Sequence, residues 1–264
     1  MKTSPMQVTL VDHMGTDLTI VNAARENLDE GIWERWFAVL REVWSSVSVV
    51  DFDMVGNKLF QLSDQDAKLI SYLAKHNHWS PFAHTSIQIR VKAPIFVARQ
   101  LVKHQVGGVW NFVPQLKQLT QFQLWNEVSR RYVDSEPEFW FPEVWRGRPV
   151  NAKQGSSGVV EVISSGSELG GFWLPRDVVM LCLDQYNNLL SQGVAPEQAR
   201  MILPQNMHTE WYWTGSLMFF CRICRERLAP GAQQETREVA EQIAEIVAPL
   251  YPVSWSALMN TKEN

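Results

Sequence analysis

The most constraining stretch of the sequence is a strand that passes directly into a helix. Over residues 85–92 apolar and polar residues alternate, with Ile87, Ile89 and Val91 on one face, as in a half-buried strand. Pro94 suits the first position of a helix, because its missing N–H would lack a partner there anyway. A sheet with helices packed against it is therefore expected here.

Capping residues, proline and glycine predict most of the other elements. Residues 8–12 are expected to form a short edge strand, and Ser63 to cap a helix that buries Leu69, Ile70 and Leu73. The Gly- and Ser-rich residues 145–171 predict a mobile loop. The signals over residues 33–50 conflict, and a helix followed by a strand or loop is expected there. Three later helices are expected, over residues 175–192, 214–228 and 232–248.

This pattern predicts an α+β fold, an antiparallel sheet packed by helices, in a single domain spanning residues 1–264. The net charge of −4 gives no basic field for a nucleic-acid polymer. No apolar run is long enough to span a membrane, and the first residues lack the apolar core of a signal peptide. Three cysteines cannot form a closed disulfide framework, which favours a reducing, cytoplasmic location.

Polar groups gather where the helix after Pro94 ends. Gln100, Lys103 and His104 have i, i+3, i+4 spacing, so they are expected on one helix face before glycines 107 and 108 break the helix. Ser129 and the arginine pair that follows it add a hydroxyl and two guanidinium groups. These groups suit a phosphorylated, planar, polar ligand. A solvated helix face with an ion-paired loop explains the same residues.

Two further clusters favour structural roles. His76, His78 and His84 could be zinc ligands, but no acidic or cysteine ligand stands nearby, so no metal is expected. Cys221 and Cys224 have the spacing of a redox motif but fall inside an expected helix, whereas a reactive dithiol normally opens one. Packing of these two cysteines in a helix is the favoured interpretation.

Several blocks of sequence resemble the flavin-dependent thymidylate synthases (ThyX). Residues 92–100 followed by residues 126–132 resemble the family's signature region, and residues 75–84 its histidine-rich turn. The family's order and spacing continue around Arg200 and from Arg227 to Gln233. The likeness covers roughly residues 11–253.

The resemblance implies an α+β fold and a homotetramer with active sites between subunits. It implies transfer of a one-carbon unit from methylenetetrahydrofolate to C5 of dUMP, with FAD as cofactor and NADPH as reductant. The alternatives are a UMP methylase or dUMP hydroxymethylase of the same fold, or a catalytically impaired protein that binds nucleotide or flavin.

The resemblance also implies the site residues. Arg227 and Ser129 are the expected catalytic residues, with Arg227 at the N3/O2 edge of the pyrimidine. Residues expected to bind the substrate are Gln100, Lys103, Glu127, Val128, Ser129, Arg130, Arg131, Arg200 and Arg227. Residues expected to bind the flavin cofactor are His78, Ser80, Lys103, His104, Gln105, Glu127 and Arg222.

The chain departs from the family's Arg-His-Arg motif at its centre. Lys103 and Gln105 replace the two arginines, and residues 111–125 form an expected insertion before Ser129. The apolar residues of this segment fit neither strand alternation nor a helical stripe. An ordered excursion with its ends close together, and with no regular element of its own, is expected. Deletion of residues 111–125 is accordingly expected to leave a folded, flavin-binding protein.

Overall fold

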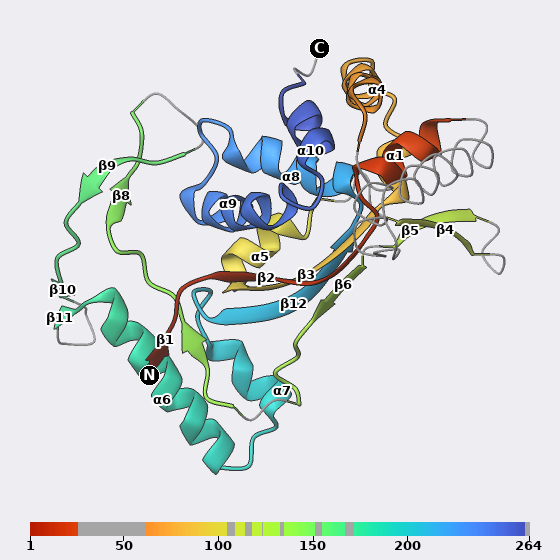
Figure 1. Ribbon diagram of the computed structural model, residues 1–264. Helices are drawn as coiled ribbons and strands as arrows, with labels where there is room; N and C mark the ends of the chain where they lie inside the picture. Colours follow the sequence, from red (N-terminus) through yellow and green to blue (C-terminus); the bar gives the residue numbers. More distant parts are fainter. Residues whose placement is uncertain are drawn as a thin grey trace, which may run out of the picture.

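The computed structural model describes residues 1–25, 62–104, 109–113, 118–122, 124–132, 135–150, 155–166 and 172–261. A four-stranded antiparallel sheet lies at its centre (Figure 1), with the strand order β2–β3–β12–β6. Its strands are β2 (Gln7–Met14), β3 (Ser86–Pro94), β12 (His208–Gly215) and β6 (Leu124–Glu127). The strand expected over residues 85–92 is confirmed, and so is the edge strand, which extends to Met14.

Helices cover one face of this sheet. Figure 1 shows α5 (Ile95–Leu101), α8 (Leu217–Leu228) and α9 (Gln234–Val247) on the same side of it. The other helices of the main core are α1 (Asp17–Ala24), α4 (Asp64–Lys75), the 3₁₀ turn η1 (Pro81–His84) and α10 (Pro252–Met259). The α+β fold is confirmed. None of the described helices is long and apolar enough to cross a membrane.

A smaller core forms around α6 (Pro175–Ser191), α7 (Pro196–Ala199) and the 3₁₀ turn η2 (Arg200–Ile202). Val179, Leu183 and Tyr186 of α6 are buried against Phe139 and Met207. Phe139 belongs to β7 (Glu138–Phe139), which pairs in parallel with β1 (Lys2–Thr3). This unit places η2 at the start of the segment that leads into β12.

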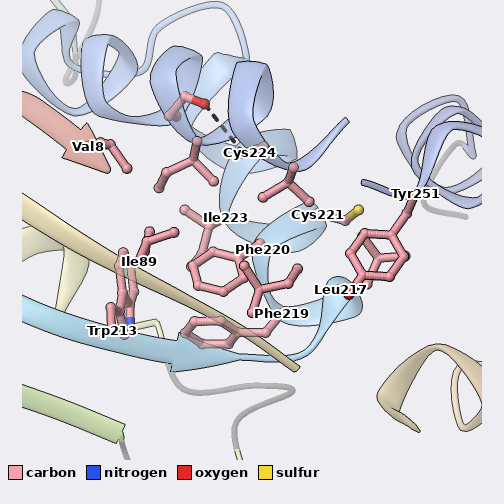
Figure 2. Packing of buried hydrophobic residues seen from close by; sticks show 14 of the residues in the cluster. Val8, Ile89, Trp213, Leu217, Phe219, Phe220, Cys221, Ile223, Cys224 and Tyr251 are labelled. Atoms are coloured by element: carbon pink, nitrogen blue, oxygen red, sulfur yellow. Dashed lines mark hydrogen bonds between the residues drawn. The ribbon is translucent and has the colours of Figure 1, made fainter. Parts of the chain in front are cut away.

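The two cysteines of α8 are packing residues, as expected. Figure 2 shows Cys221 and Cys224 among apolar side chains, and neither is exposed. The Cys224 thiol lies 3.5 Å from the Ala240 carbonyl oxygen of α9, to which it donates. Burial raises the pKa of both thiols, which keeps them protonated.

The starts of α4 and α8 compare differently with expectation. The α4 helix begins as expected, with the Ser63 hydroxyl accepting from the Asp66 N–H at 3.2 Å. The α8 helix begins only at Leu217, because Ser216 caps it. The helix expected from residue 214 is therefore wrong at its start, since Thr214 belongs to β12.

The α5 helix ends at Leu101, so Lys103 and His104 follow it in a turn. The His104 N–H donates to the Leu101 carbonyl at 3.0 Å, an i→i−3 contact that tightens the chain. The helix face predicted to carry Gln100, Lys103 and His104 together is therefore wrong. The glycines expected to break this helix, and Gln105, lie outside the described residues, as do residues 33–50.

The stretch expected as a mobile loop contains paired strands. The hairpin β8 (Trp145–Gly147) and β9 (Ser157–Val160) is antiparallel, as is the pair β10 (Ser165–Gly166) and β11 (Phe172–Trp173). These strands are two to four residues long, which is too short for an alternation of apolar and polar residues to be recognised in the sequence. They form because each pairs with a partner strand. Residues 151–154 and 167–171 lie outside the described part.

The segment expected as an irregular insertion is mostly a hairpin. Strands β4 (Val109–Val113) and β5 (Gln118–Phe122) are antiparallel, and Val109 pairs with Phe122. The expected lack of a regular element is wrong, because two strands that pair with each other need no buried stripe. Leu124 and Trp125 belong to β6 of the main sheet.

Candidate active site

The first group of expected site residues lies where α5 and α8 end. The Arg227 Nε–H donates to His104 Nε2 at 2.9 Å. The His104 side chain is 9% exposed, and its Nδ1 lies 3.8 Å from a carboxylate oxygen of Glu226. Burial is the main cause that lowers the pKa of His104 from 6.5. The charges of Arg227 and Arg222 lower it further, while Glu226 opposes them.

Gln100 joins this group through α9. Its side-chain amide donates to the Gln233 side-chain oxygen, and Gln233 is the residue that precedes α9 as its N-cap. Lys103 is exposed, whereas Arg222 is partly buried on α8. Gln233 and Glu226 were not among the expected site residues. Gln233 could have been found from the matching C-terminal block, whereas no sequence signal marked Glu226.

The second group follows β6. The Glu127 carboxylate accepts from the Thr209 hydroxyl at 2.8 Å and from the Trp125 indole at 3.3 Å. Val128 is exposed, and its N–H donates to the Glu210 carbonyl at 2.8 Å, which extends the pairing of β6 with β12. Glu127 is therefore fixed at the edge of the sheet by the strand that lies beside it.

Ser129 and the two arginines form a compact turn beyond Glu127. The Ser129 hydroxyl accepts from the backbone N–H of Arg131 at 3.4 Å and from its Nε at 3.1 Å. The Arg131 guanidinium lies 5.0 Å from the ring centre of Tyr132, whose side chain is exposed. Arg130 donates to the Ser135 carbonyl at 2.8 Å. The turn presents a hydroxyl and a guanidinium side by side, and both groups can donate hydrogen bonds to a phosphate.

The remaining expected residues lie elsewhere on the chain. His78 and Ser80 are exposed in the turn between α4 and η1, where the rings of His78 and Tyr72 are 5.9 Å apart. Arg200 is exposed in η2 and donates from Nε to the Glu197 carbonyl at 3.2 Å. Across the described part of the chain, no three His, Cys, Asp or Glu side chains are grouped to hold a metal ion.

Among the described residues, the expected site residues of one chain lie in separate places. Figure 1 shows α4, beside the His78 turn, at the opposite end of the molecule from α7, which leads into Arg200. Within the described ranges, no hydrogen bond, ion pair or ring contact joins the Arg227 group, the Ser129 turn and the His78 turn. In the same ranges Arg131, Arg200, Arg222 and Arg227 have no carboxylate within 4.0 Å. Such arginines suit an anionic ligand.

Residues 9–253 match the protein family described as thymidylate synthase complementing protein. The chain belongs to this family. It is 36% identical over 250 residues to the flavin-dependent thymidylate synthase of Thermus thermophilus, covering 95% of this chain and 74% of that protein. The enzyme of the same description from Kosmotoga olearia is 30% identical over 253 residues, with coverages of 96% and 90%. The resemblance to flavin-dependent thymidylate synthases is thus confirmed, and the chain is an enzyme of that family.

Solved structures support the same fold. The UMP/dUMP methylase PolB from Streptomyces cacaoi, bound with 5-Br dUMP, superposes with a TM-score of 0.66 at 25% identity, covering 99% of this chain and 98% of that one. The same protein bound with 5-Br UMP gives a TM-score of 0.67 at 24% identity over 100% and 99% of the two chains. The arrangement of strands and helices around Arg227 is therefore that of a known family fold.

Proposed function

We propose that this flavin-dependent thymidylate synthase family member transfers a one-carbon unit from methylenetetrahydrofolate to C5 of dUMP. FAD is the flavin, and NADPH is the reductant. Family membership supports the reaction class. The observation that carries the assignment is the Arg227 guanidinium, whose Nε is bound to His104 while no described carboxylate lies within 4.0 Å of it.

Arg227 supplies the charge that the reaction needs. A guanidinium presents a planar pair of donors that matches the N3/O2 edge of a pyrimidine. Donors placed at that edge favour the form of the ring that is ionised at N3, and this makes C5 nucleophilic. Activation of the ring is then electrostatic and needs no covalent bond to the protein.

The cysteines are consistent with this route. Cys221 and Cys224 are buried, and burial raises the pKa of each thiol, so neither is a ready thiolate nucleophile. All three cysteines, including Cys182 on α6, are free. Free thiols also support our proposal of a cytoplasmic location.

The nucleotide is held, in this proposal, by residues from separate parts of the fold. Ser129 and Arg131 bind the phosphate, with Gln100 and Arg200 completing the sugar-phosphate and base contacts. Glu127, Val128, Arg130 and Lys103 line the same site. Because no hydrogen bond or ion pair joins the Ser129 turn to the Arg227 group among the described residues, we propose that different copies contribute them, in a homotetramer with active sites between subunits.

The chain's donors fit an anionic dinucleotide such as FAD. Lys103 and Arg222 would supply positive charge and Ser80 a hydroxyl, and these three side chains are exposed or partly buried. His78, His104, Gln105 and Glu127 would complete the flavin site, with Glu127 as an acceptor and not as a donor. When bound, FAD supplies the hydride chemistry of the reaction, drawing on NADPH. The protein's own part is to orient the ligands and to supply fixed charge.

A second substrate is favoured by one observation. The solved relative at 25% identity is described as a UMP/dUMP methylase, so UMP is the alternative nucleotide. Recognition at the ribose 2′ position distinguishes the two.

Product mass tests the proposal. The purified protein is incubated with FAD, NADPH, methylenetetrahydrofolate and either dUMP or UMP. We expect dTMP from dUMP, together with bleaching of the flavin spectrum by NADPH. A methylated UMP would assign the alternative substrate, and a hydroxymethyl product would assign a hydroxymethylase. Flavin binding without any product would contradict an active enzyme.

A further inference from the structure

The Arg227 guanidinium is held from one side by a neutral imidazole. An arginine Nε can only donate a hydrogen bond, so His104 Nε2, 2.9 Å away, must be the acceptor. An imidazole that accepts at Nε2 carries its proton at Nδ1 and has no net charge. The contact therefore fixes both the tautomer and the charge of His104.

Glu226 favours that tautomer from the other side of the ring. Its carboxylate oxygen lies 3.8 Å from His104 Nδ1, which is too far for a direct hydrogen bond but close enough to attract the Nδ1 proton. Glu226 directly precedes Arg227 on α8, so one helix end carries both groups that face the imidazole. The Glu226 side chain is 51% exposed, so its effect is screened by water.

This arrangement leaves one edge of the guanidinium available to a ligand. The Nε–H donates to His104, while the two terminal nitrogens have no hydrogen-bond partner among the described residues. A guanidinium is planar, so fixing Nε fixes the direction of both terminal nitrogens. A group that is oriented before the ligand arrives loses less entropy on binding.

We propose that His104 and Glu226 are positioning residues for the thymidylate synthase reaction. His104 orients the Arg227 guanidinium toward the pyrimidine, and Glu226 keeps the His104 proton on Nδ1. The inference rests on the proposed function, in which Arg227 meets the nucleotide. It gives His104 a task other than direct contact with the flavin.

The arrangement depends on pH. Protonation of His104 removes the acceptor at Nε2 and places a second cation beside Arg227. The charged groups that face His104 are Arg227, Glu226 and Arg222 of α8, with Lys103 beside it in the chain; Gln100 and Gln233, which link α5 to α9, are uncharged. Since burial lowers the pKa of His104 from 6.5, the contact holds at neutral pH and is lost below that lowered pKa.

Steady-state kinetics over pH test the proposal. His104→Leu removes the acceptor and keeps the bulk, and we expect kcat to fall about 100-fold, as a displacement of about 1 Å can cause, with a smaller rise in KM for dUMP. His104→Gln retains an acceptor that cannot be protonated, so kcat should largely recover. The fall of kcat at low pH, which is the acid limb of the pH–kcat profile, should disappear. Glu226→Gln removes the charge that raises the pKa of His104, so the acid limb should move to lower pH.

The exposed His13 of β2 provides the matched control, because His13→Gln should leave the rates and the pH profile unchanged. Equal flavin content and melting temperature establish that each variant is folded. If His104→Leu folds and retains wild-type kcat, or if Glu226→Gln leaves the acid limb in place, the positioning role is wrong.

NMR of the unliganded protein separates this inference from the proposed function. With ¹⁵N-labelled arginine, the Arg227 Nε–H signal should be protected from exchange at neutral pH and lost on acidification. It should be absent in His104→Leu and retained in the His13→Gln control. A protected signal in a protein that makes no dTMP would overturn the function and keep the geometry. An Arg227 Nε–H that exchanges equally fast in wild type and His104→Leu would overturn the positioning role, whatever the turnover.

Discussion

Trp125 stacks on Trp211, with ring centroids 4.3 Å apart and an angle of 19° between the ring planes. Trp125 also meets the edge of Trp213, at 5.3 Å. Trp211 and Trp213 of β12 are fully buried, so these contacts attach the short strand β6 to the core. Glu127 and Ser129 follow directly, which makes the stacked pair a support for the predicted substrate-binding turn.

The hairpin β4–β5 should be removable, whereas Trp125 should not. Replacing residues 110–121 by Asn-Gly joins the paired Val109 and Phe122 through a two-residue turn. We expect a folded protein with flavin affinity at least equal to that of the parent, as measured by thermal melting and flavin titration. Trp125→Ala should destabilise the fold by about 2 kcal/mol, measured by urea unfolding, because it removes a partly buried side chain that stacks on the core.

The comparison of these two variants corrects the expected deletion of residues 111–125. That deletion removes Leu124 and Trp125 from the main sheet together with the hairpin. An unfolded product would thus report the loss of β6 rather than the importance of the hairpin. Should the Asn-Gly variant itself fail to fold, the hairpin would be part of the core.

Patterns within a few neighbouring residues predicted the elements that depend on those residues alone. The alternation at Ile87, Ile89 and Val91 marked β3, and the capping Ser63 marked α4. The end of strand β12 could not be predicted from such local signals, and Thr214 was assigned to the helix that follows. Its place in the sheet depends on Gln88, whose amide donates to the Thr214 hydroxyl at 3.2 Å from a strand 126 residues earlier. No window of neighbouring residues contains that partner.

The candidate site shows a similar division. The resemblance located Arg227 and His104, because family motifs are linear stretches of sequence. The bond between their side chains, and the placement of Glu226 beside the imidazole, arise where α5 and α8 end close together. The turn after Leu101, which aims His104 at Arg227, replaced an expected helical turn. Side-chain contacts between separate elements can be identified only from the three-dimensional structure.

Arg227→Ala should retain flavin and lose most turnover. Loss of one preorganised donor at developing charge costs about 2.7–4 kcal/mol, or on the order of 100- to 1000-fold in kcat. Single-turnover formation of dTMP and the flavin absorbance of the purified variant measure the two effects. The exposed Arg99 of α5 supplies the control, since Arg99→Ala should keep normal rates. Near-native turnover by Arg227→Ala would contradict the proposed function.

Replacement of all three cysteines by alanine should leave the chemistry intact. Cys221 and Cys224 fill the core of α8, so truncation lowers stability without removing a reacting group. Turnover per mole of folded, flavin-containing protein should stay within a few-fold of wild type. The mechanism without a thiol nucleophile fails if any single cysteine variant is folded, binds flavin and makes no product.

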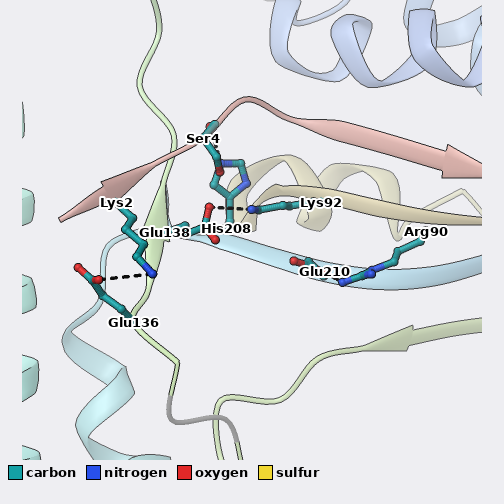
Figure 3. A network of polar contacts seen from close by, with 8 residues as sticks. All are labelled: Lys2, Ser4, Arg90, Lys92, Glu136, Glu138, His208 and Glu210. Carbon is teal, nitrogen blue, oxygen red and sulfur yellow. Dashed lines mark hydrogen bonds and ion pairs between the residues drawn. The ribbon is translucent and has the colours of Figure 1, made fainter.

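His208 joins the N-terminal segment to the sheet and should make stability depend on pH. Figure 3 shows it beside Ser4, Lys92 and Glu138, and its Nε2 lies 2.9 Å from the Ser4 carbonyl, to which the ring N–H donates. Burial is the main cause that lowers its pKa from 6.5, and Lys92 adds to this, against the opposing effects of Ser4 and Glu138. The folded protein therefore holds His208 neutral at pH values where the unfolded chain is protonated.

The direction in which stability changes with pH follows from proton binding at His208. Below about pH 6.5 the unfolded state takes up a proton at His208 that the folded state does not, so the free energy of unfolding falls as the pH falls toward the lowered pKa. His208→Gln keeps a donor for the Ser4 carbonyl and cannot titrate. Urea unfolding between about pH 7.5 and 5.5, at fixed protein and flavin concentrations, should show a shallower loss of stability for this variant than for wild type. The exposed His76 gives the control, because His76→Gln should follow the wild-type slope. Identical slopes for wild type and His208→Gln would show that His208 is protonated equally in both states.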